Sequence, residues 1–541
     1  MRVEDFMSFC REHPHLICYG AGFMANYTIQ FLRECGIEPK AVIVSGLPTE
    51  KCFMGTIPYG SVKNFSVKEG NRYGILLTLQ EMYHVPVRKN IEAHFGEQAD
   101  VFALTEDDVD MLESIVRRER QKALFSAPVE ADAETVKHYD ERIKTIRHQY
   151  KRVLVRSMFA LAIGGYPAWI NYCYERTRLA DDGFFYLFYP ATRIDMPQFD
   201  LIGANEFLLS KLQAPGMEMI TRRNADFWRY FYQKFPGLFY FDDGYSMRDW
   251  MNGRWNVFAT SHDMDFGTSF LHLKNEEEIE GLHQAEAMGL KGKYACFSAR
   301  DNLNGKAVAQ TFSDTGRLSA RFRNSDIKKC RMAAEHLADH HIQAVRMGAL
   351  SNERADWDNT IDYASSYRNP FMDVWLAQHC EFFASVPSGI NALAQLCQRP
   401  MICYNAVAAT LRGDVTIVFS RNRDLAIFKK YWLPREQRYL TLTEMLEIET
   451  NEKLHERSTV GAYKTLDKMG VEVQENTSEE IWDVMEEMAL RVEGKMVYSE
   501  EDERLAKKYF SIIDNFPMQY NFPYMWRVGR KFLRENPWLL E

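Results

Sequence analysis

FFASVPSGINALAQL, residues 382–396, combines a strand, a turn of small residues and a helix in one short stretch. The apolar opening is typical of a strand buried on both faces, and the closing half repeats apolar residues at helical spacing. Between them, Ser388 and Gly389 present a hydroxyl and backbone N–H groups at a helix N-terminus, which favours anions. The stretch lacks the Gly-Lys-Ser/Thr ending of a P-loop, so it indicates anion binding without ATP hydrolysis.

Strands and helices alternate with short connections on both sides of this stretch. The predicted strands cover 294–299, 343–347, 381–385 and 401–404, and the predicted helices cover 327–340, 371–379 and 389–397. Such alternation predicts an α/β fold with a parallel sheet. Ligands of such sheets bind beyond the carboxyl ends of the strands.

Polar residues follow the predicted strands at that edge. Arg300 and Asp301 come directly after the first strand, and arginine suits a diphosphate because its planar fork makes paired hydrogen bonds. Arg323 and Asn324 precede a helix, and Arg346 ends the second strand. An Arg300–Asp301 pair that only fixes a loop, and a capping role for Asn324, are the alternatives. The other candidates at this edge are Gly348, Asp362, Tyr363, Ser385, Ser388 and Gly389.

A second glycine turn lies near the start of the chain, in HLICYGAGFMANYTIQFLRECGI, residues 15–37. Gly20, Gly22 and Ala25 satisfy the GxGxxA pattern between a predicted strand and a predicted helix, as in nucleotide-binding folds. The next strand ends at Ser45, where NAD binding requires an acid. A structural turn without a cofactor is therefore favoured, nucleotide binding stays open, and we expect Gly22→Ala to disturb folding more than catalysis.

Composition divides the chain of 541 residues into several parts, as expected for this length. We expect a Rossmann-like domain over 1–112, a helical linker over 113–150, an aromatic, glycine-punctuated unit over 151–285, the parallel-sheet unit over 286–445, and a mostly helical segment over 446–541 that packs back on the preceding units.

Charge and cysteine usage exclude several classes of protein. The net charge of -9 argues against a nucleic-acid partner, because phosphate binding needs a basic surface. The ten cysteines form no CxxC pairs, which argues against zinc and a disulfide framework and favours a reducing compartment. No apolar run reaches the ~18 residues of a membrane span, and the N-terminus lacks a signal-peptide pattern. We expect a cytoplasmic protein, with peripheral membrane attachment through the basic, aromatic residues 520–538 left open.

Several of these motifs occur in the same order in a family of bacterial glycosyltransferases found with surface-carbohydrate genes. Residues 293–445 resemble that family, which is distantly similar to fucosyltransferase-type GT-B enzymes. The resemblance is carried by ARD (299–301), RNSDI (323–327), VRMG (345–348), IDYA (361–364), MDVWL (372–376), PSG (387–389) and LTLTEML (440–446). The first unit resembles the small Rossmann-like domains of bacterial sugar-modifying enzymes, through YGAG (19–22) and MGTIPYG (54–60).

The resemblance implies a GT-B fold of two facing Rossmann-like halves, with the acceptor bound by 151–285 and a nucleotide-sugar donor bound by 286–445. It implies that Arg300 binds the donor diphosphate, and it slightly favours a GDP-sugar, although Ser298 stands where the fucosyltransferase motif has a histidine. The implied activity is metal-independent transfer of a sugar to a bacterial surface glycan or glycoprotein, in surface polysaccharide biosynthesis, with no obligatory cofactor.

A general base would come from the 151–285 unit. Asp182, His262 and Asp263 are candidates, and no spacing singles out one of them. Asp263 and Asp265 have the form of a metal-binding DxD element, but such pairs arise often by chance and we expect no metal. Two other functions stay open: a nucleotide-sugar-binding or NAD(P)-dependent sugar-modifying protein that uses the Gly20–Ala25 turn, and a noncatalytic scaffold of glycan assembly.

Overall fold

The computed structural model describes residues 3–46, 57–79, 81–159, 183–191, 205–211, 216–221, 223–241, 271–300, 322–348, 353–407, 424–450, 465–515 and 526–541. Contacts divide the chain into two compact units. The first comprises Met1–Thr145, Arg152–Arg156 and Asn224–Ser246, and the second comprises Ile146–Lys151, Ser157–Arg223 and Met247–Glu541.

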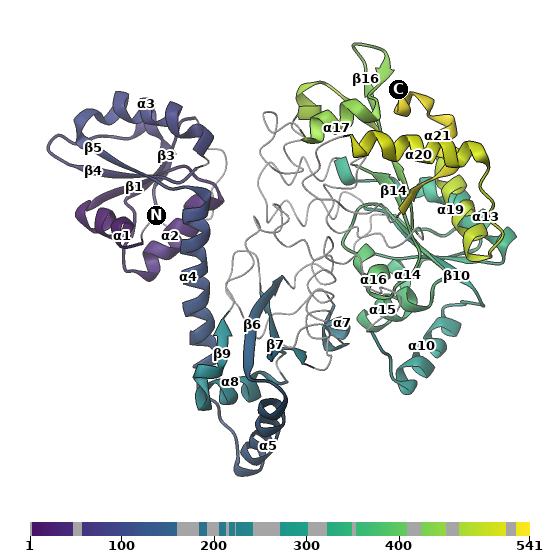
Figure 1. The fold of residues 1–541 in the computed structure, drawn as a ribbon, viewed down its shortest axis with the longest axis horizontal. Helices are drawn as coiled ribbons and strands as arrows, with labels where there is room; N and C mark the ends of the chain where they lie inside the picture. The colour runs from purple at the N-terminus through teal and green to yellow at the C-terminus, as the bar shows by residue number, and fades with distance from the viewer. Residues whose placement is uncertain are drawn as a thin grey trace. The chain divides into compact units, whose positions relative to one another are not determined.

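The first unit contains a five-stranded parallel sheet of order β3-β2-β1-β4-β5 (Figure 1). The strands are β1 (His15–Tyr19), β2 (Ala41–Val44), β3 (Tyr59–Ser61), β4 (Tyr73–Leu77) and β5 (Ala99–Ala103). Helices α1 (Val3–Glu12), α2 (Phe23–Glu34), α3 (His84–Phe95) and α4 (Glu106–Phe125) accompany it. The strand order reverses between β1 and β4, so the sheet is doubly wound.

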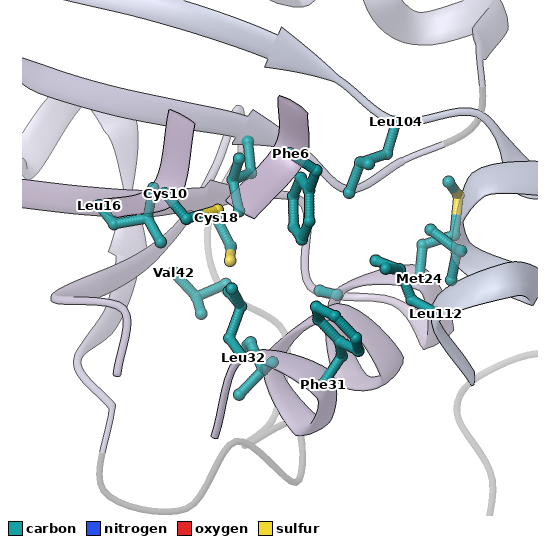
Figure 2. Packing of buried hydrophobic residues seen from close by; sticks show 14 of the residues in the cluster. Phe6, Cys10, Leu16, Cys18, Met24, Phe31, Leu32, Val42, Leu104 and Leu112 are labelled. Carbon is teal, nitrogen blue, oxygen red and sulfur yellow. The ribbon is translucent and has the colours of Figure 1, made fainter. Parts of the chain in front are cut away.

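Two apolar layers hold this sheet to its helices. On one face, Phe6, Phe31 and Leu112 from α1, α2 and α4 belong to one apolar cluster, and Figure 2 shows Phe6 and Phe31 between Cys18 and Leu112. On the other face, Val87 and the rest of the apolar side of α3 pack against alternate strand residues. Each such side chain that becomes fully buried stabilises the fold by about 1.5–3 kcal/mol.

Further elements complete the first unit. Helix α4 begins with a capping box between Thr105 and Asp108, and α5 (Ala133–Gln149) and α8 (Ala225–Lys234) follow in the chain. The Arg142 guanidinium lies 4.0 Å from the centroid of the Phe227 ring, a cation–π contact. Strand β6 (Arg152–Phe159) pairs in parallel with β9 (Phe239–Phe241). Single 3₁₀ turns are η1 (Val62–Asn64), η2 (Glu81–Tyr83), η3 (Gly96–Gln98) and η5 (Pro236–Leu238).

The second unit is built on a seven-stranded parallel sheet of order β12-β11-β10-β13-β14-β15-β19. The strands are β10 (Tyr294–Ser298), β11 (Gln343–Arg346), β12 (Thr360–Ile361), β13 (Phe383–Ser385), β14 (Met401–Ala406), β15 (Asp424–Phe428) and β19 (Trp526–Val528). Strands β10, β13, β14 and β15 are buried along their whole length. This burial explains why they read as continuous apolar runs in the sequence.

Helices pack around this sheet and on one another (Figure 1). They are α10 (Asn275–Ala287), α13 (Arg331–His336), α14 (Tyr363–Ser366), α15 (Pro370–His379), α16 (Asn391–Leu396), α17 (Leu442–Thr450), α19 (Ser478–Val492), α20 (Glu500–Asp514) and α21 (Arg530–Glu535), with 3₁₀ turns η7 (Ile327–Cys330), η8 (Leu337–His340) and η9 (Pro537–Leu540). Helix α19 packs on α13, β14 and β15. The segment after residue 446 therefore covers the sheet of its own unit.

Smaller elements accompany this sheet in the second unit. Strands β7 (Phe184–Ala191) and β8 (Met217–Met219) pair in parallel. A small antiparallel sheet joins β16 (Lys430–Leu433) to β17 (Arg438–Tyr439) and β18 (Glu472–Gln474). Helix α7 (Glu206–Lys211) packs on α15.

These sheets confirm the predicted α/β class, and the strands predicted at 294–299, 343–347, 381–385 and 401–404 are present as β10, β11, β13 and β14. The predicted helix over 327–340 is present as η7, α13 and η8 in succession. The segment 446–541, expected to be mostly helical, also supplies β18 and β19. Each of these strands has three residues, which is too short for a period-two pattern to be recognised.

Two observations bear on the expected cellular environment. No helix in the described part of the chain is long and apolar enough to cross a membrane. The cysteines that the structure describes are free thiols, and all of them except Cys35 are buried. Burial raises the pKa of the Cys10 thiol to about 12, so it stays protonated and unreactive at neutral pH.

Candidate functional site

The order of the seven-stranded sheet reverses between β10 and β13, and ligands of such sheets bind at the carboxyl edge of this switch point. Strand β10 ends at Ser298 and β13 ends at Ser385, and their Oγ atoms lie 2.8 Å apart in the interior. Ser385 Oγ is also 3.2 Å from Ser388 Oγ. The hydroxyl groups of Ser298, Ser385 and Ser388 therefore form a row from the core to the half-buried turn before α16.

A short segment, Arg323–Ser325, crosses this edge and is attached to four neighbouring strands. Ser325 N donates to Arg300 O beyond β10 at 2.8 Å, and Arg323 Nη2 donates to Pro387 O beyond β13 at 3.0 Å. Asn405, in β14, donates through Nδ2 to Ser325 Oγ at 2.7 Å. Lys429, beyond β15, donates through Nζ to Asn324 O at 2.5 Å. We call Arg323–Ser325 the edge segment.

Lys429 is a cation inside this edge, with 3% of its surface exposed. The pKa of its ammonium group is lowered to about 8, mainly by burial; the nearby Glu475 carboxylate raises this pKa and Lys329 lowers it. Glu475 Oε2 accepts hydrogen bonds from Ser325 Oγ at 3.2 Å and from Asp326 N at 3.0 Å. The edge therefore holds a buried lysine and a carboxylate on the side of the edge segment that faces β14 and β15.

Two asparagines fix the outer part of the edge. Asn405 has a left-handed backbone with φ 51°, a conformation that asparagine tolerates better than most residues. Its backbone N–H donates to Asn476 Oδ1 at 2.7 Å, and Asn476 N donates to Asn405 Oδ1 at 2.6 Å. Asn476 Nδ2 donates to Phe428 O at 2.9 Å. These bonds join the ends of β14 and β15 to the start of α19.

Arg346 ends β11 but turns into the protein. It is 4% exposed, and Nη1 lies 3.2 Å from each carboxylate oxygen of Asp362 and 2.5 Å from Glu353 O. Asp362 also accepts from Ala355 N at 2.9 Å and caps α14. These two predicted ligand contacts therefore bond each other within the protein.

Tyr363 is fully buried and serves the packing of α15. Its hydroxyl donates to Asp373 Oδ1 at 2.9 Å, and Asn369 N donates to the same hydroxyl at 3.0 Å. Asp373 accepts from Arg368 at 3.1 Å and from Asn205 Nδ2 at 3.3 Å. Burial raises the pKa of Asp373, which Arg368 opposes. Asp373 thus holds the chain before α7 against α15, a larger role than the first-turn helix charge that its sequence position suggests.

The structure brings part of the predicted site together. Arg300, Arg323, Asn324, Ser385, Ser388 and Gly389 meet at the edge between β10 and β13. Gly348, with φ +148°, turns the chain after β11. Asp301 and the three candidate bases, Asp182, His262 and Asp263, lie outside the described residues.

Sequence reasoning missed Lys429, Asn405 and Glu475. The sequence signal for Lys429 was the pair of lysines that directly follows the buried strand DLAIF, because a charge at the carboxyl end of such a strand points to a ligand edge. Asn405 and Glu475 gave no such signal. Within the described residues, no group of His, Cys, Asp and Glu side chains could hold a metal ion, and Asp263 and Asp265 lie outside them.

The glycine turn of the first unit depends on Gly20. Its φ is +116°, and a Cβ there would lie 2.6 Å from Thr78 O. Thr78 Oγ1 in turn donates to the carbonyls of Tyr19 and Gly20, at 3.2 Å each. Gly22 has φ −89° and open space around its Cβ position. This geometry argues against the expectation that Gly22→Ala disturbs folding, because the close approach is made by Gly20.

The other two positions of this turn have structural neighbours. Ala25 is fully buried in α2, where it contributes to the apolar layer of the first unit. Ser45 Oγ, at the place where an NAD-binding acid would stand, lies 3.0 Å from the Tyr19 hydroxyl. Ligand binding at Gly20, Gly22 and Ala25 stays a prediction.

No family model matches the sequence, and the curated proteins contain no significant match. The chain is similar to the solved structure of the iron-containing dodecameric glycosyltransferase TibC from enterotoxigenic E. coli H10407, with 14% identity and a TM-score of 0.24 over 47% of this chain and 58% of that chain. The match thus spans less than two thirds of the TibC chain.

Two further similar structures are also glycosyltransferases. E. coli heptosyltransferase WaaC with ADP-2-deoxy-2-fluoro heptose has 12% identity and a TM-score of 0.19, over 76% of this chain and 92% of that chain. The glycosyl transferase family 9 protein from Veillonella parvula DSM 2008 has 10% identity and a TM-score of 0.23, over 84% and 95%. Because these TM-scores lie well below 0.5, we infer no function for this chain from these enzymes.

Proposed function

We propose that this protein is a GT-B-type glycosyltransferase that moves a sugar from a nucleotide-sugar donor to a bacterial surface glycan or glycoprotein. The observation that supports it most is the switch point between β10 and β13, where the edge segment with Arg323 is hydrogen-bonded to Arg300 and to the turn that carries Ser388. A doubly wound sheet binds nucleotides at such an edge. Paired arginines and a hydroxyl suit the diphosphate of the donor.

In this proposal the bond between the anomeric carbon and the donor diphosphate breaks, and an acceptor hydroxyl oxygen forms the new bond to that carbon. The transition state carries positive charge on the sugar and growing negative charge on the leaving diphosphate. Arg300 and Arg323 would stabilise that negative charge without a metal. The acceptor proton would pass to a base, for which Asp182, His262 and Asp263 are the candidates.

Among the arginines predicted at this edge, we assign Arg323 rather than Arg346 to the diphosphate beside Arg300. Arg346 is buried and bonded to Asp362 and Glu353 O, so we assign it to the packing of the loop before α14. Arg323 replaces it, because its guanidinium reaches the turn that carries Ser388. The proposed donor contacts are therefore Arg300, Arg323 and Ser388.

A screen of ligands against thermal unfolding tests the proposal. GDP-, UDP-, dTDP- and CMP-sugars are compared with NAD(P), and a bound ligand at a hundred times its Kd stabilises the fold by about 2.7 kcal/mol. We expect one nucleotide-sugar class to raise the melting temperature, with a GDP-sugar slightly favoured, and NAD(P) to leave it unchanged. A shift by NAD(P) alone would favour the Gly20–Ala25 turn as the functional site. No shift and no turnover would favour a scaffold.

A further inference from the structure

Lys429 is a buried lysine at the carboxyl edge of the seven-stranded sheet. It follows directly on β15 and is 3% exposed, and among the described residues its ammonium group donates one hydrogen bond, to Asn324 O. A lysine ammonium has three donors, and burying a charge that is not fully paired is unfavourable. Packing alone therefore gives no reason for a lysine at this position.

The acceptor of that bond belongs to a peptide group with a second attachment. The Asn324 carbonyl accepts from Lys429 Nζ at 2.5 Å, and the N–H of the same peptide group, on Ser325, donates to Arg300 O at 2.8 Å. One peptide group thus connects the end of β15 to the residue beyond β10. Because the connected residues include Arg300 and the neighbour of Arg323, we expect a movement of Asn324 to shift both proposed diphosphate contacts.

We propose that Lys429 is a positioning residue for the donor site, whose ammonium holds the Asn324 carbonyl and thereby sets Arg300 and Arg323 where the diphosphate binds. This inference rests on the proposed function. It adds that the affinity for the donor depends on Lys429, which lies on the far side of the edge segment. Arg323 remains the ligand contact, and Lys429 acts through it.

The charges around Lys429 give the proposal a pH signature. Lys329, on η7, lies near it, and Glu475, which follows β18, acts with the opposite sign. The next residue, Lys430, pairs with Glu480 of α19 at 2.8 Å. Burial lowers the pKa of Lys429 to about 8, so the ammonium is present below pH 8 and lost as pH rises above it. A bound diphosphate favours the charged form, so binding takes up a proton near pH 8.5.

Titration calorimetry with GDP as the probe, using full-length protein, tests this. We expect the Kd of wild-type protein to rise up to about tenfold between pH 7 and pH 9, as the charged fraction falls. Lys429→Met should raise the Kd for GDP at pH 7 about tenfold and remove the dependence of this Kd on pH. It should also remove the proton uptake on binding, which is measured by repeating the titration in buffers of different ionisation enthalpy. Lys430→Met is the matched control, because it removes the adjacent lysine and its pairing with Glu480 and should leave GDP binding unchanged.

The remaining outcomes separate this inference from the function on which it rests. If wild-type protein binds GDP and Lys429→Met binds it equally well at every pH, Lys429 is only structural and the inference is overturned. If wild-type protein binds neither GDP nor UDP, ADP, CMP or dTDP, the proposed function and the inference both fail. Should Lys429→Met not fold, Lys429→Gln and the wild-type pH series still decide whether Lys429 positions the donor site.

Cleavage by trypsin tests the same inference without nucleotide. We expect faster cleavage after Arg323 in Lys429→Met than in wild-type protein, and an unchanged rate counts against positioning.

Discussion

The turn after β1 in the first unit requires a glycine at position 20. Its left-handed backbone and its contact with the Thr78 carbonyl both exclude a side chain. We predict that Gly20→Ala lowers the free energy of unfolding by roughly 1–3 kcal/mol or more. Gly22→Ala should change the free energy of unfolding little, because the space around Gly22 is open. Urea denaturation of both variants measures this. Equal losses in the two would contradict the geometry of the turn.

Arg346 and Asp362 test whether an arginine at a strand end binds ligand or only packs. Removing one member of a buried pair leaves the other charge without compensation and destabilises a protein by about 3–5 kcal/mol. We therefore predict that Arg346→Met unfolds at much lower urea concentration than wild-type protein, while the folded fraction keeps its nucleotide affinity. Calorimetry on folded protein checks the second part. A loss of affinity there would return Arg346 to the donor site.

At the scale of elements, α10 and α15 meet at a glycine. A Cβ on Gly281 would lie 2.2 Å from Trp375 Cδ1, and the Trp375 indole donates to Glu278 at 3.1 Å. Alanine is favoured over glycine within a helix by about 1 kcal/mol, whereas overpacking costs about 1–3 kcal/mol. Because the clash is with a rigid ring, we predict a net loss of stability in Gly281→Ala, measured by thermal unfolding. A gain would show that α10 moves freely on α15.

Strands β10, β11, β13 and β14 of the seven-stranded sheet were predictable, because strands such as β10 and β14 are buried along their length and so carry continuous apolar runs. Strand β15 was missed although it is equally buried. Strands β12 and β19 have only two and three residues, too few for a pattern to be recognised. The edge segment was only half predictable. Arg323 was predicted from the sequence as a residue of this edge. Its hydrogen bond to Pro387, like the ion pair of Arg346 with Asp362, depends on how the loops fold and could not be predicted. Lys429 and Asn405 come from separate strands, and their meeting at Asn324 and Ser325 arises only from the sheet order.

At the scale of the whole molecule, the N-terminal sheet needs more chain than residues 1–112 provide. Helix α4 runs to Phe125, Val116 lies in the core of this sheet, and Arg120 Nε donates to Glu34 at 2.6 Å. A fragment of residues 1–121 should therefore be more stable than 1–112, by about the 1.5–3 kcal/mol of a buried valine. Urea denaturation followed by circular dichroism measures the difference. Equal stabilities would mean that the second half of α4 contributes nothing to this core.

The proposed function requires a diphosphate bound at the edge between β10 and β13, and titration calorimetry of Arg300→Ala tests this binding most directly. The titrant is the nucleoside diphosphate that binds wild-type protein, beginning with GDP. Charge-assisted hydrogen bonds contribute about 1.5–3 kcal/mol each. The predicted Kd is therefore roughly tenfold to a hundredfold higher than in wild-type protein. Arg300→Lys should recover only part of the affinity, because a point charge cannot make paired bonds.

Arg354, an exposed arginine paired with Asp356, provides the matched control. Arg354→Ala should bind the same nucleotide as tightly as wild-type protein does. If folded Arg300→Ala also binds it with unchanged affinity, the nucleotide does not bind at this edge and the proposed donor site is wrong.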